Sequence, residues 1–199
     1  MFNREKKRNA GMIAEKKKAI LESTLHLVRE NGFHGTPMSL VAKKAGVAAG
    51  TIYHYFDSKD ALIMELFAYT QQMALTALQK ELRADMAFKE GFFLRWINRC
   101  QFYIEHPNML FFIEQFVNSP YYPRCPREDS ENLQNEIFHF IQRGQQEGIL
   151  RDLNPHLMSI MIHSSIMTAA KVHLTQKVTL TDKEFEQLAQ MVWDSIRKL

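Results

Sequence analysis

Residues 39–59 read SLVAKKAGVAAGTIYHYFDSK, and this stretch carries the strongest indication of the fold. We expect two short helices here, over residues 39–45 and 50–56, with a tight turn between them. Ser39 is a suitable N-cap, because its hydroxyl can accept a hydrogen bond from an otherwise unpaired backbone N–H. Gly46 is expected to end the first helix, since glycine readily takes the left-handed conformation. The stretch therefore predicts a helix-turn-helix.

The second of these helices has two contrasting sides. Ile52 and Phe56 can pack with apolar residues of the first helix on a buried side. Its other side carries a hydroxyl, a phenol and an imidazole among its groups. A short helix of this kind suits a recognition helix placed in the DNA major groove. The outward-facing residues are Thr51, Tyr53, His54 and Tyr55.

The residues before this stretch predict a third helix, over residues 13–31. Leu21, Leu25 and Val28 recur at i, i+4 and i+7, which is typical of an amphipathic helix. Three helices then fit into about sixty residues, as in helix-turn-helix units. Residues 1–12 are basic and have no hydrophobic period, so we expect a flexible arm there. Such an arm could contact DNA, or it could be only a loose tail.

Charge is spread unevenly along the 199 residues. Residues 1–60 contain eleven Lys or Arg against six Asp or Glu, which leaves +5. Because the whole chain carries +3, residues 61–199 carry −2. A basic end on a nearly neutral body is typical of a protein that binds nucleic acid, although a solvated basic tail would give the same count.

The stretch and its surroundings resemble the TetR family of transcriptional regulators over residues 13–62. The departure from the family pattern is Ala48, where the family often has a serine. The resemblance implies an all-α fold, with an N-terminal DNA-binding unit and a C-terminal helical domain that binds a ligand and dimerises. The matching positions are Gly32, Phe33, Thr36, Ser39–Ala42, Ala45–Val47, Gly50–Phe56, Ser58, Lys59 and Leu62.

The resemblance also implies which residues contact DNA. The start of the second short helix would face base edges, and Thr51 could hydrogen-bond to a base and touch a thymine methyl. Lys59 would add charge to a helix N-terminus that already suits anions. Tyr55 could instead be half-buried core, and Ser39 could be only a cap. The full set is Thr36, Ser39, Ala49, Gly50, Thr51, Tyr53, His54, Tyr55 and Lys59.

The remaining residues predict a helical domain over 61–199, after an arm at 1–12 and a DNA-binding unit at 13–60. Helices are expected over residues 59–83, 88–105, 108–117, 129–147, 155–175 and 182–198. Most of the phenylalanines fall between residues 88 and 140. They could form an ordinary aromatic core, but the family resemblance favours a small-molecule pocket. The candidate lining residues are Trp96, Arg99, Tyr103, Phe112, Gln115, Phe116, Phe138 and His163.

The last two helices are both amphipathic. They could close their own domain, or pair with the same helices of a second copy in a four-helix bundle with two-fold symmetry. Reading a palindromic operator requires two recognition helices about 34–36 Å apart. We therefore expect a homodimer formed through these helices and bound to double-stranded DNA.

Signals for other classes of protein are weak. No nucleophile lies in a recognisable catalytic setting, and we expect neither an enzyme, nor a metal site, nor a cofactor. Cys100 and Cys125 form no disulfide framework. No apolar run approaches the roughly 20 residues of a membrane span, and no secretory signal is evident. We expect a cytoplasmic protein.

Together these patterns predict a DNA-binding transcriptional regulator, most simply a repressor released from its operator by a small apolar or amphipathic effector. An activator of the same fold remains an alternative, as does a thiol-redox sensor using Cys100 or Cys125. A helical small-molecule-binding protein without DNA function is the alternative from another class.

Overall fold

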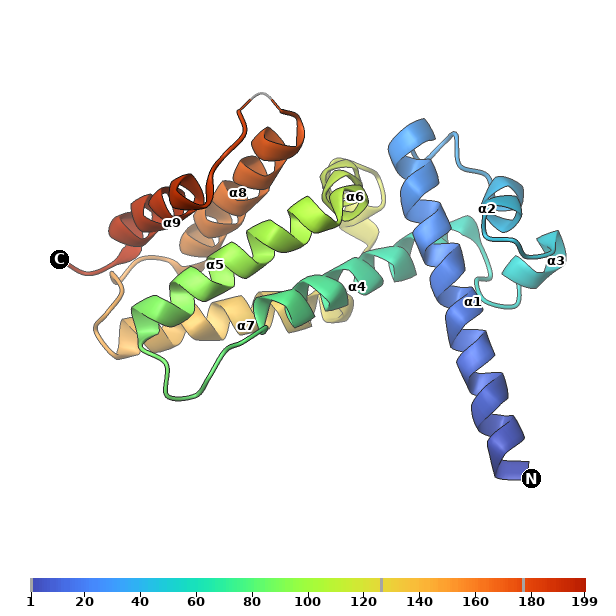
Figure 1. Ribbon diagram of the computed structural model, residues 1–199, viewed down its shortest axis with the longest axis horizontal. Coiled ribbons are helices and arrows are strands. Elements are labelled where there is room, and N and C mark those ends of the chain that lie inside the picture. Colours follow the sequence, from blue (N-terminus) through green and yellow to red (C-terminus); the bar gives the residue numbers. More distant parts are fainter. Residues whose placement is uncertain (1, 126, 177) are drawn as a thin grey trace. The chain divides into compact units, whose positions relative to one another are not determined.

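A computed structural model describes residues 2–125, 127–176 and 178–199, with side chains described for 14–125, 133–176 and 178–199. All described elements are helices, apart from an isolated bridge between Leu150 and Arg197. The all-α prediction is confirmed. The helices are α1 (Phe2–Asn31), α2 (Met38–Lys44), α3 (Ala49–Ile52), α4 (Lys59–Leu78), α5 (Phe88–Glu105), α6 (Pro107–Val117), the 3₁₀ turn η1 (Tyr122–Arg124), α7 (Arg127–Gln146), α8 (Pro155–Leu174) and α9 (Asp182–Ile196) (Figure 1).

The chain forms two compact units, which we describe separately. Unit 1 comprises residues 1–70 and 111–125, and unit 2 comprises residues 71–110 and 126–199. The division falls inside α4 and inside α6, ten residues later than the boundary predicted after residue 60. Unit 1 therefore takes up residues 111–125, a segment predicted to belong to the helical domain.

The helix-turn-helix forms the core of unit 1. Val28 of α1, Val41 of α2 and Ile52 of α3 are fully buried, and Phe56 beyond α3 is 2% exposed. The turn between α2 and α3 depends on Gly46, whose φ of +68° is the predicted left-handed conformation. This glycine ends α2 and lets the chain reverse into α3.

The ends of three helices in unit 1 differ from the prediction. α2 begins at Met38, with Pro37 in extended conformation as N-cap, so Ser39 lies inside the first turn and makes no cap. α3 ends at Ile52, and the chain continues to Phe56 in tight turns, where the His54 amide donates to Thr51 O. α1 begins at Phe2 rather than residue 13, so the predicted flexible arm is helical. Arg, Lys, Glu and Ala are good helix formers even without an apolar stripe. The arm's side chains lie outside the described residues.

Residues 111–125 complete unit 1. Phe112 packs edge-on against Phe33, with ring centroids 5.9 Å apart, and Phe116 stacks on Phe67 at 4.3 Å. Gln115 Nε2 donates to Val28 O at 3.4 Å. These contacts hold the second half of α6 within unit 1.

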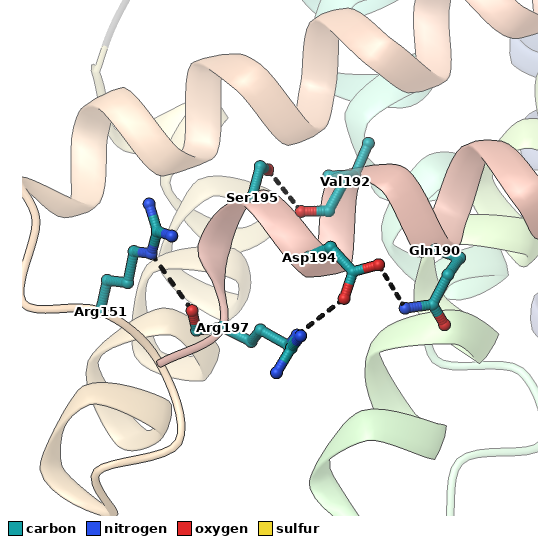
Figure 2. Close-up of polar contacts among 6 residues, drawn as sticks. All are labelled: Arg151, Gln190, Val192, Asp194, Ser195 and Arg197. Atoms are coloured by element: carbon teal, nitrogen blue, oxygen red, sulfur yellow. Dashed lines mark hydrogen bonds and ion pairs between the residues drawn. The ribbon is translucent and has the colours of Figure 1, made fainter. Parts of the chain in front are cut away.

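Unit 2 is a helical bundle in which α5 packs against α8 and α9, and α7 packs against α8 (Figure 1). Its chain end is fastened to the loop after α7 by backbone bonds, from Arg151 N to Ile196 O and from Lys198 N to Ile149 O. Figure 2 shows the polar contacts around this closure. Arg197 Nε lies 2.7 Å from Asp194 Oδ1, and Arg151 Nε donates to the backbone oxygen of Arg197. Gln190 Nε2 donates to the other carboxylate oxygen of Asp194.

Candidate DNA-binding surface and effector cavity

The start of α3 offers an exposed polar surface on a buried support. Ile52 and Phe56 face the core, whereas Ala49, Gly50 and His54 are exposed and the Tyr53 side chain is 56% exposed. Thr51 is half-buried, with its amide donating to Ala48 O. The surface combines a phenol, an imidazole and a hydroxyl, all of which can bond phosphates or base edges.

The flanking residues predicted to contact DNA lie in different settings. Ser39 is exposed at the first turn of α2. Thr36 is only 1% exposed, and its hydroxyl donates to Gly32 O at 2.8 Å. Thr36, expected to contact DNA, thus has a buried side chain that supports the turn before α2. Tyr55 is half-buried beside the Phe56 ring, with ring centroids 6.5 Å apart, so part of its surface belongs to the core.

The Lys59 side chain crosses to the turn after α1. Its ammonium donates to Phe33 O, and Ser58 Oγ accepts the Ala61 amide at the start of α4. An ammonium carries three N–H groups, so one bond to a carbonyl leaves others for a phosphate. Lys59 thus ties the start of α4 to the turn after α1 while keeping positive charge at the N-terminus of α4.

Unit 2 contains a small apolar cavity of about 30 Å³ between α4, α5, α7 and α8. A space of this size holds about one water molecule. Aliphatic and aromatic side chains supply most of its wall, and two arginines supply the rest. The lining residues are Leu78, Phe92, Arg95, Trp96, Arg99, Ile137, Phe140, Ile162 and Ile166.

Polar groups at the cavity are joined to neighbouring helices. Arg99 is 2% exposed, and its Nη2 donates to His163 Nδ1 at 2.9 Å. Burial, followed by the positive charge of Arg99, lowers the pKa of His163 to about 3, so this imidazole is neutral near pH 7. Arg95 Nη2 lies 3.4 Å from Glu136 Oε1, while Trp96 Nε1 donates to Ser165 Oγ at 2.9 Å.

The structure brings together some of the predicted ligand-binding residues and separates others. Trp96 and Arg99 line the cavity, and His163 bonds to Arg99 behind it. Tyr103 is fully buried one turn along α5, with no partner for its hydroxyl among the described residues. Phe138 is half-buried against the His156 ring. Phe112, Gln115 and Phe116 belong to unit 1, where they pack on α1 and α4, and do not line this cavity.

The sequence prediction missed several lining residues. Phe92 lies one turn before Trp96 and Arg95 one turn before Arg99, so helical spacing could have added them. Leu78, Ile137 and Phe140 come from other helices, and only tertiary packing brings them here. Glu136 and His139 have the Glu-x-x-His spacing of half a di-iron site, but Glu136 pairs with Arg95. Over the described residues, no three metal-binding side chains group together, and no helix there is long and apolar enough to span a membrane.

An exposed recognition helix on a buried support, joined to a second helical unit, defines the class of helix-turn-helix transcriptional regulators. The sequence matches the family described as bacterial regulatory proteins, tetR family, over residues 20–66, and the tetracyclin repressor-like C-terminal domain over residues 87–197. The second match alone covers more than half of the chain. The chain therefore belongs to the TetR family.

Similar proteins agree with this assignment. An uncharacterized HTH-type transcriptional regulator of Haemophilus influenzae is 26% identical over 90% of this chain and 94% of its own. A TetR family regulator of Marinobacter aquaeolei has a TM-score of 0.87 at 22% identity, over 96% of this chain and all of its own. FadR of Bacillus subtilis, solved with stearoyl-CoA, has a TM-score of 0.73 at 21% identity, over 89% and 95%. These two structures share the fold.

Transcription regulation and DNA binding through the helix-turn-helix are thereby confirmed for this chain, and its relatives are regulators rather than enzymes. The alternative of a small-molecule-binding protein without DNA function is wrong.

Proposed function

We propose that this regulator is a homodimeric repressor, released from a palindromic operator by an apolar or amphipathic effector that occupies the cavity of unit 2. The observation that carries the proposal is the cavity itself. Its wall is mainly aliphatic and aromatic, with two arginines as polar groups. Small-molecule sites typically combine an apolar wall with a few polar groups that orient the ligand. FadR of Bacillus subtilis, which shares the fold, holds stearoyl-CoA in its solved structure.

The cavity lining suggests how an effector would act on DNA binding. Leu78 lines the cavity and is the last residue of α4, and the same helix begins at Lys59. A ligand larger than one water molecule must displace part of the wall. A ligand that binds the opened form more tightly shifts the protein toward that form. If that form binds the operator less well, ligand and DNA weaken each other by the same factor, typically 5–150-fold.

A dimer is proposed from the outer surfaces of the last two helices. Leu157, Ile160 and Met161 of α8 are 64%, 61% and 39% exposed, and Met191 of α9 is 68% exposed. Ser195 Oγ of α9 lies 3.6 Å from Met161 Sδ, so these groups are close together. Pairing this surface with a second copy would bury the apolar side chains and supply the second recognition helix that a palindrome requires.

Thiol sensing through Cys100 is a weaker candidate than ligand sensing. Cys100 is 1% exposed, and burial raises the pKa of its thiol to about 12. Because the thiolate is the reactive form, this cysteine is poorly suited to rapid oxidation.

Titration of the full chain with selected and random duplexes tests the DNA-binding part of the proposal. We expect log affinity to fall steeply with log salt concentration, since Lys and Arg displace counterions. Tyr53→Phe should weaken binding to all sequences by about fivefold, the loss of one hydrogen bond. Thr51→Ala should reduce the preference for the selected sequence.

Tyr122→Phe is the matched control, because Tyr122 is also an exposed tyrosine but lies in η1. A flat salt dependence would contradict phosphate binding. An unchanged sequence preference in Thr51→Ala would rule out base reading by that residue. Repression itself is tested by transcription from the selected operator with and without the regulator, where increased transcription would indicate an activator.

A further inference from the structure

Arg99 is a buried cation, and the side chains that the structure describes place no anion beside it. Its side chain is 2% exposed, and its Nη2 donates to His163, which is neutral near pH 7. Among the described side chains, no carboxylate forms an ion pair with Arg99, and its Nε has no hydrogen-bond partner. A buried charge is normally paired, because removal from water is otherwise costly. The geometry therefore leaves a guanidinium in the cavity wall able to receive an anion.

The neighbouring groups limit the charge of that anion. Arg95 lines the same cavity, but it already lies 3.4 Å from Glu136. The two arginines and this glutamate together carry one net positive charge. A monoanion balances that charge, whereas a phosphate dianion would exceed it. The Arg guanidinium matches a carboxylate through two parallel N–H donors.

The other lining residues indicate the chemistry of the rest of the ligand. Leu78, Phe92, Phe140 and Ile162 surround the space with hydrocarbon and no further charge. Tyr103, one turn along α5 from Arg99, does not line the cavity but is buried, with no partner for its hydroxyl among the described residues. The cavity of about 30 Å³ is well below the 300–1,000 Å³ usual for ligand sites, so a ligand must push the apolar wall apart.

We propose that the effector is an amphipathic monocarboxylate, whose carboxylate pairs with Arg99 and whose apolar body opens the cavity lined by Leu78 and Phe140. This inference rests on the proposed effector site in unit 2. An aliphatic acid and an aromatic acid share this chemistry, and both have suitable surfaces in the wall.

Calorimetry tests the proposal by measuring how tightly chosen probes bind the full chain in the absence of DNA. We use decanoate and 4-phenylbutanoate as the aliphatic and aromatic acids, 1-decanol and decylamine as matched uncharged and cationic probes, and stearoyl-CoA as a thioester. We expect at least one acid to bind at least tenfold more tightly than decanol, and decylamine to bind weakest. The better of the two acids identifies the body of the ligand.

Two variants connect this preference to the guanidinium. Arg99→Met should lose the acid-over-alcohol preference while keeping, or raising, the melting temperature without ligand, because a buried unpaired charge has been removed. Arg99→Lys should retain part of the preference. Binding of both acids no more tightly than decanol by the native chain would overturn the proposal without any variant. So would binding of stearoyl-CoA but of neither acid, or unchanged affinity of the better-binding acid in Arg99→Met.

Operator release is measured separately, by adding the bound acid to the protein–DNA complex. Acid binding through Arg99 without release would support this inference and contradict the proposed repressor mechanism. Release by decanol alone would support the mechanism and contradict the carboxylate.

Discussion

Ala48 lies where α3 begins, and its methyl group cannot cap the helix. It occupies the N-cap position with extended backbone and no side-chain hydrogen bond. Ala48→Ser would supply a hydroxyl that can accept an amide hydrogen of α3, which typically stabilises a protein by about 1 kcal/mol. The same hydroxyl could donate to a DNA phosphate. We expect a higher melting temperature without DNA and operator affinity about fivefold tighter.

Unfolding and DNA titration separate the two roles of that hydroxyl. A higher melting temperature with unchanged operator affinity would limit the serine to capping. An unchanged melting temperature together with an unchanged operator affinity would mean that residue 48 neither caps α3 nor contacts a phosphate. Thr51, three residues later, is the reference for base reading, since a phosphate contact at residue 48 should tighten binding to all sequences equally.

His163 gives the fold a defined pH dependence. Its pKa is lowered to about 3 in the folded protein, mainly by burial and further by Arg99, from an ordinary 6.5. Between pH 3 and pH 6.5, His163 therefore binds more protons in the unfolded chain than in the folded protein. The contribution to stability is fully present above about pH 6.5 and is lost as the pH falls toward 3. Between pH 7 and pH 4.5 we expect a loss of about 2 kcal/mol from this histidine.

Urea unfolding of the native chain and of His163→Gln at both pH values measures this loss. The stability difference between pH 7 and 4.5 should be smaller in the variant by about that amount, because glutamine does not titrate. His156→Gln, an exposed histidine on the same helix, is the control. An equal pH dependence in the native chain and His163→Gln would contradict the buried, neutral imidazole.

At the scale of elements, the packing of unit 2 depends on side chains that approach α7 closely at Gly144. A Cβ added at Gly144 would lie 2.4 Å from Phe88 Cζ and 2.7 Å from Leu150 Cδ1. Phe88 is also stacked on Phe140, with ring centroids 4.3 Å apart, so it has little room to move. We expect Gly144→Ala to cost about 1–2 kcal/mol, since overpacking exceeds the gain in helix propensity.

A thermal melt should therefore show a fall of roughly 2–8 °C for Gly144→Ala in a chain of this size. Gly50→Ala is the matched control, because Gly50 also lies in a helix and a Cβ added there meets nothing within 4 Å. A melting temperature for Gly144→Ala equal to that of Gly50→Ala would mean that Phe88 and Leu150 can move aside at little cost.

The helices themselves were predictable where local patterns are strong. Gly46 ends α2 as expected, and the apolar period of Leu21, Leu25 and Val28 lies on the buried face of α1. Helix ends were less predictable. Pro37 took the N-cap position expected for Ser39, because its extended backbone suits a cap without any side-chain bond. α3 stopped at Ile52, since turns can bury Phe56 without a longer helix.

At the scale of the whole molecule, the DNA-binding surface was easier to predict than the cavity. The recognition residues are consecutive, so a short motif identifies them. The cavity joins four helices, and no local pattern indicates which of their residues meet. An aromatic residue predicted from sequence can serve a core as well as a pocket. Phe112 and Phe116 pack within unit 1, whereas the sequence predicts them in a pocket with Trp96. Sequence indicated the buried arginine only as one polar candidate among several.

The proposed dimer is the property of the whole molecule that joins these parts. Ile160 is 61% exposed between Leu157 and Met161, at the centre of the apolar surface of α8. We expect the native chain to sediment at twice 23.3 kDa at micromolar concentration, and Ile160→Glu to sediment at that single mass. A charge buried in an apolar interface has no partner there and weakens association.

Operator affinity should fall with the loss of the dimer. A monomer binds one half-site, so we expect at least a hundredfold weaker binding to a palindrome, while binding to an isolated half-site stays the same. Val178→Glu is the control, because Val178 is 51% exposed but lies between α8 and α9. Should Ile160→Glu remain a dimer while Val178→Glu dissociates, the interface would lie at the connection between these helices. Because only linked recognition helices read both halves of a palindrome, a dimeric mass without palindrome preference would contradict this arrangement.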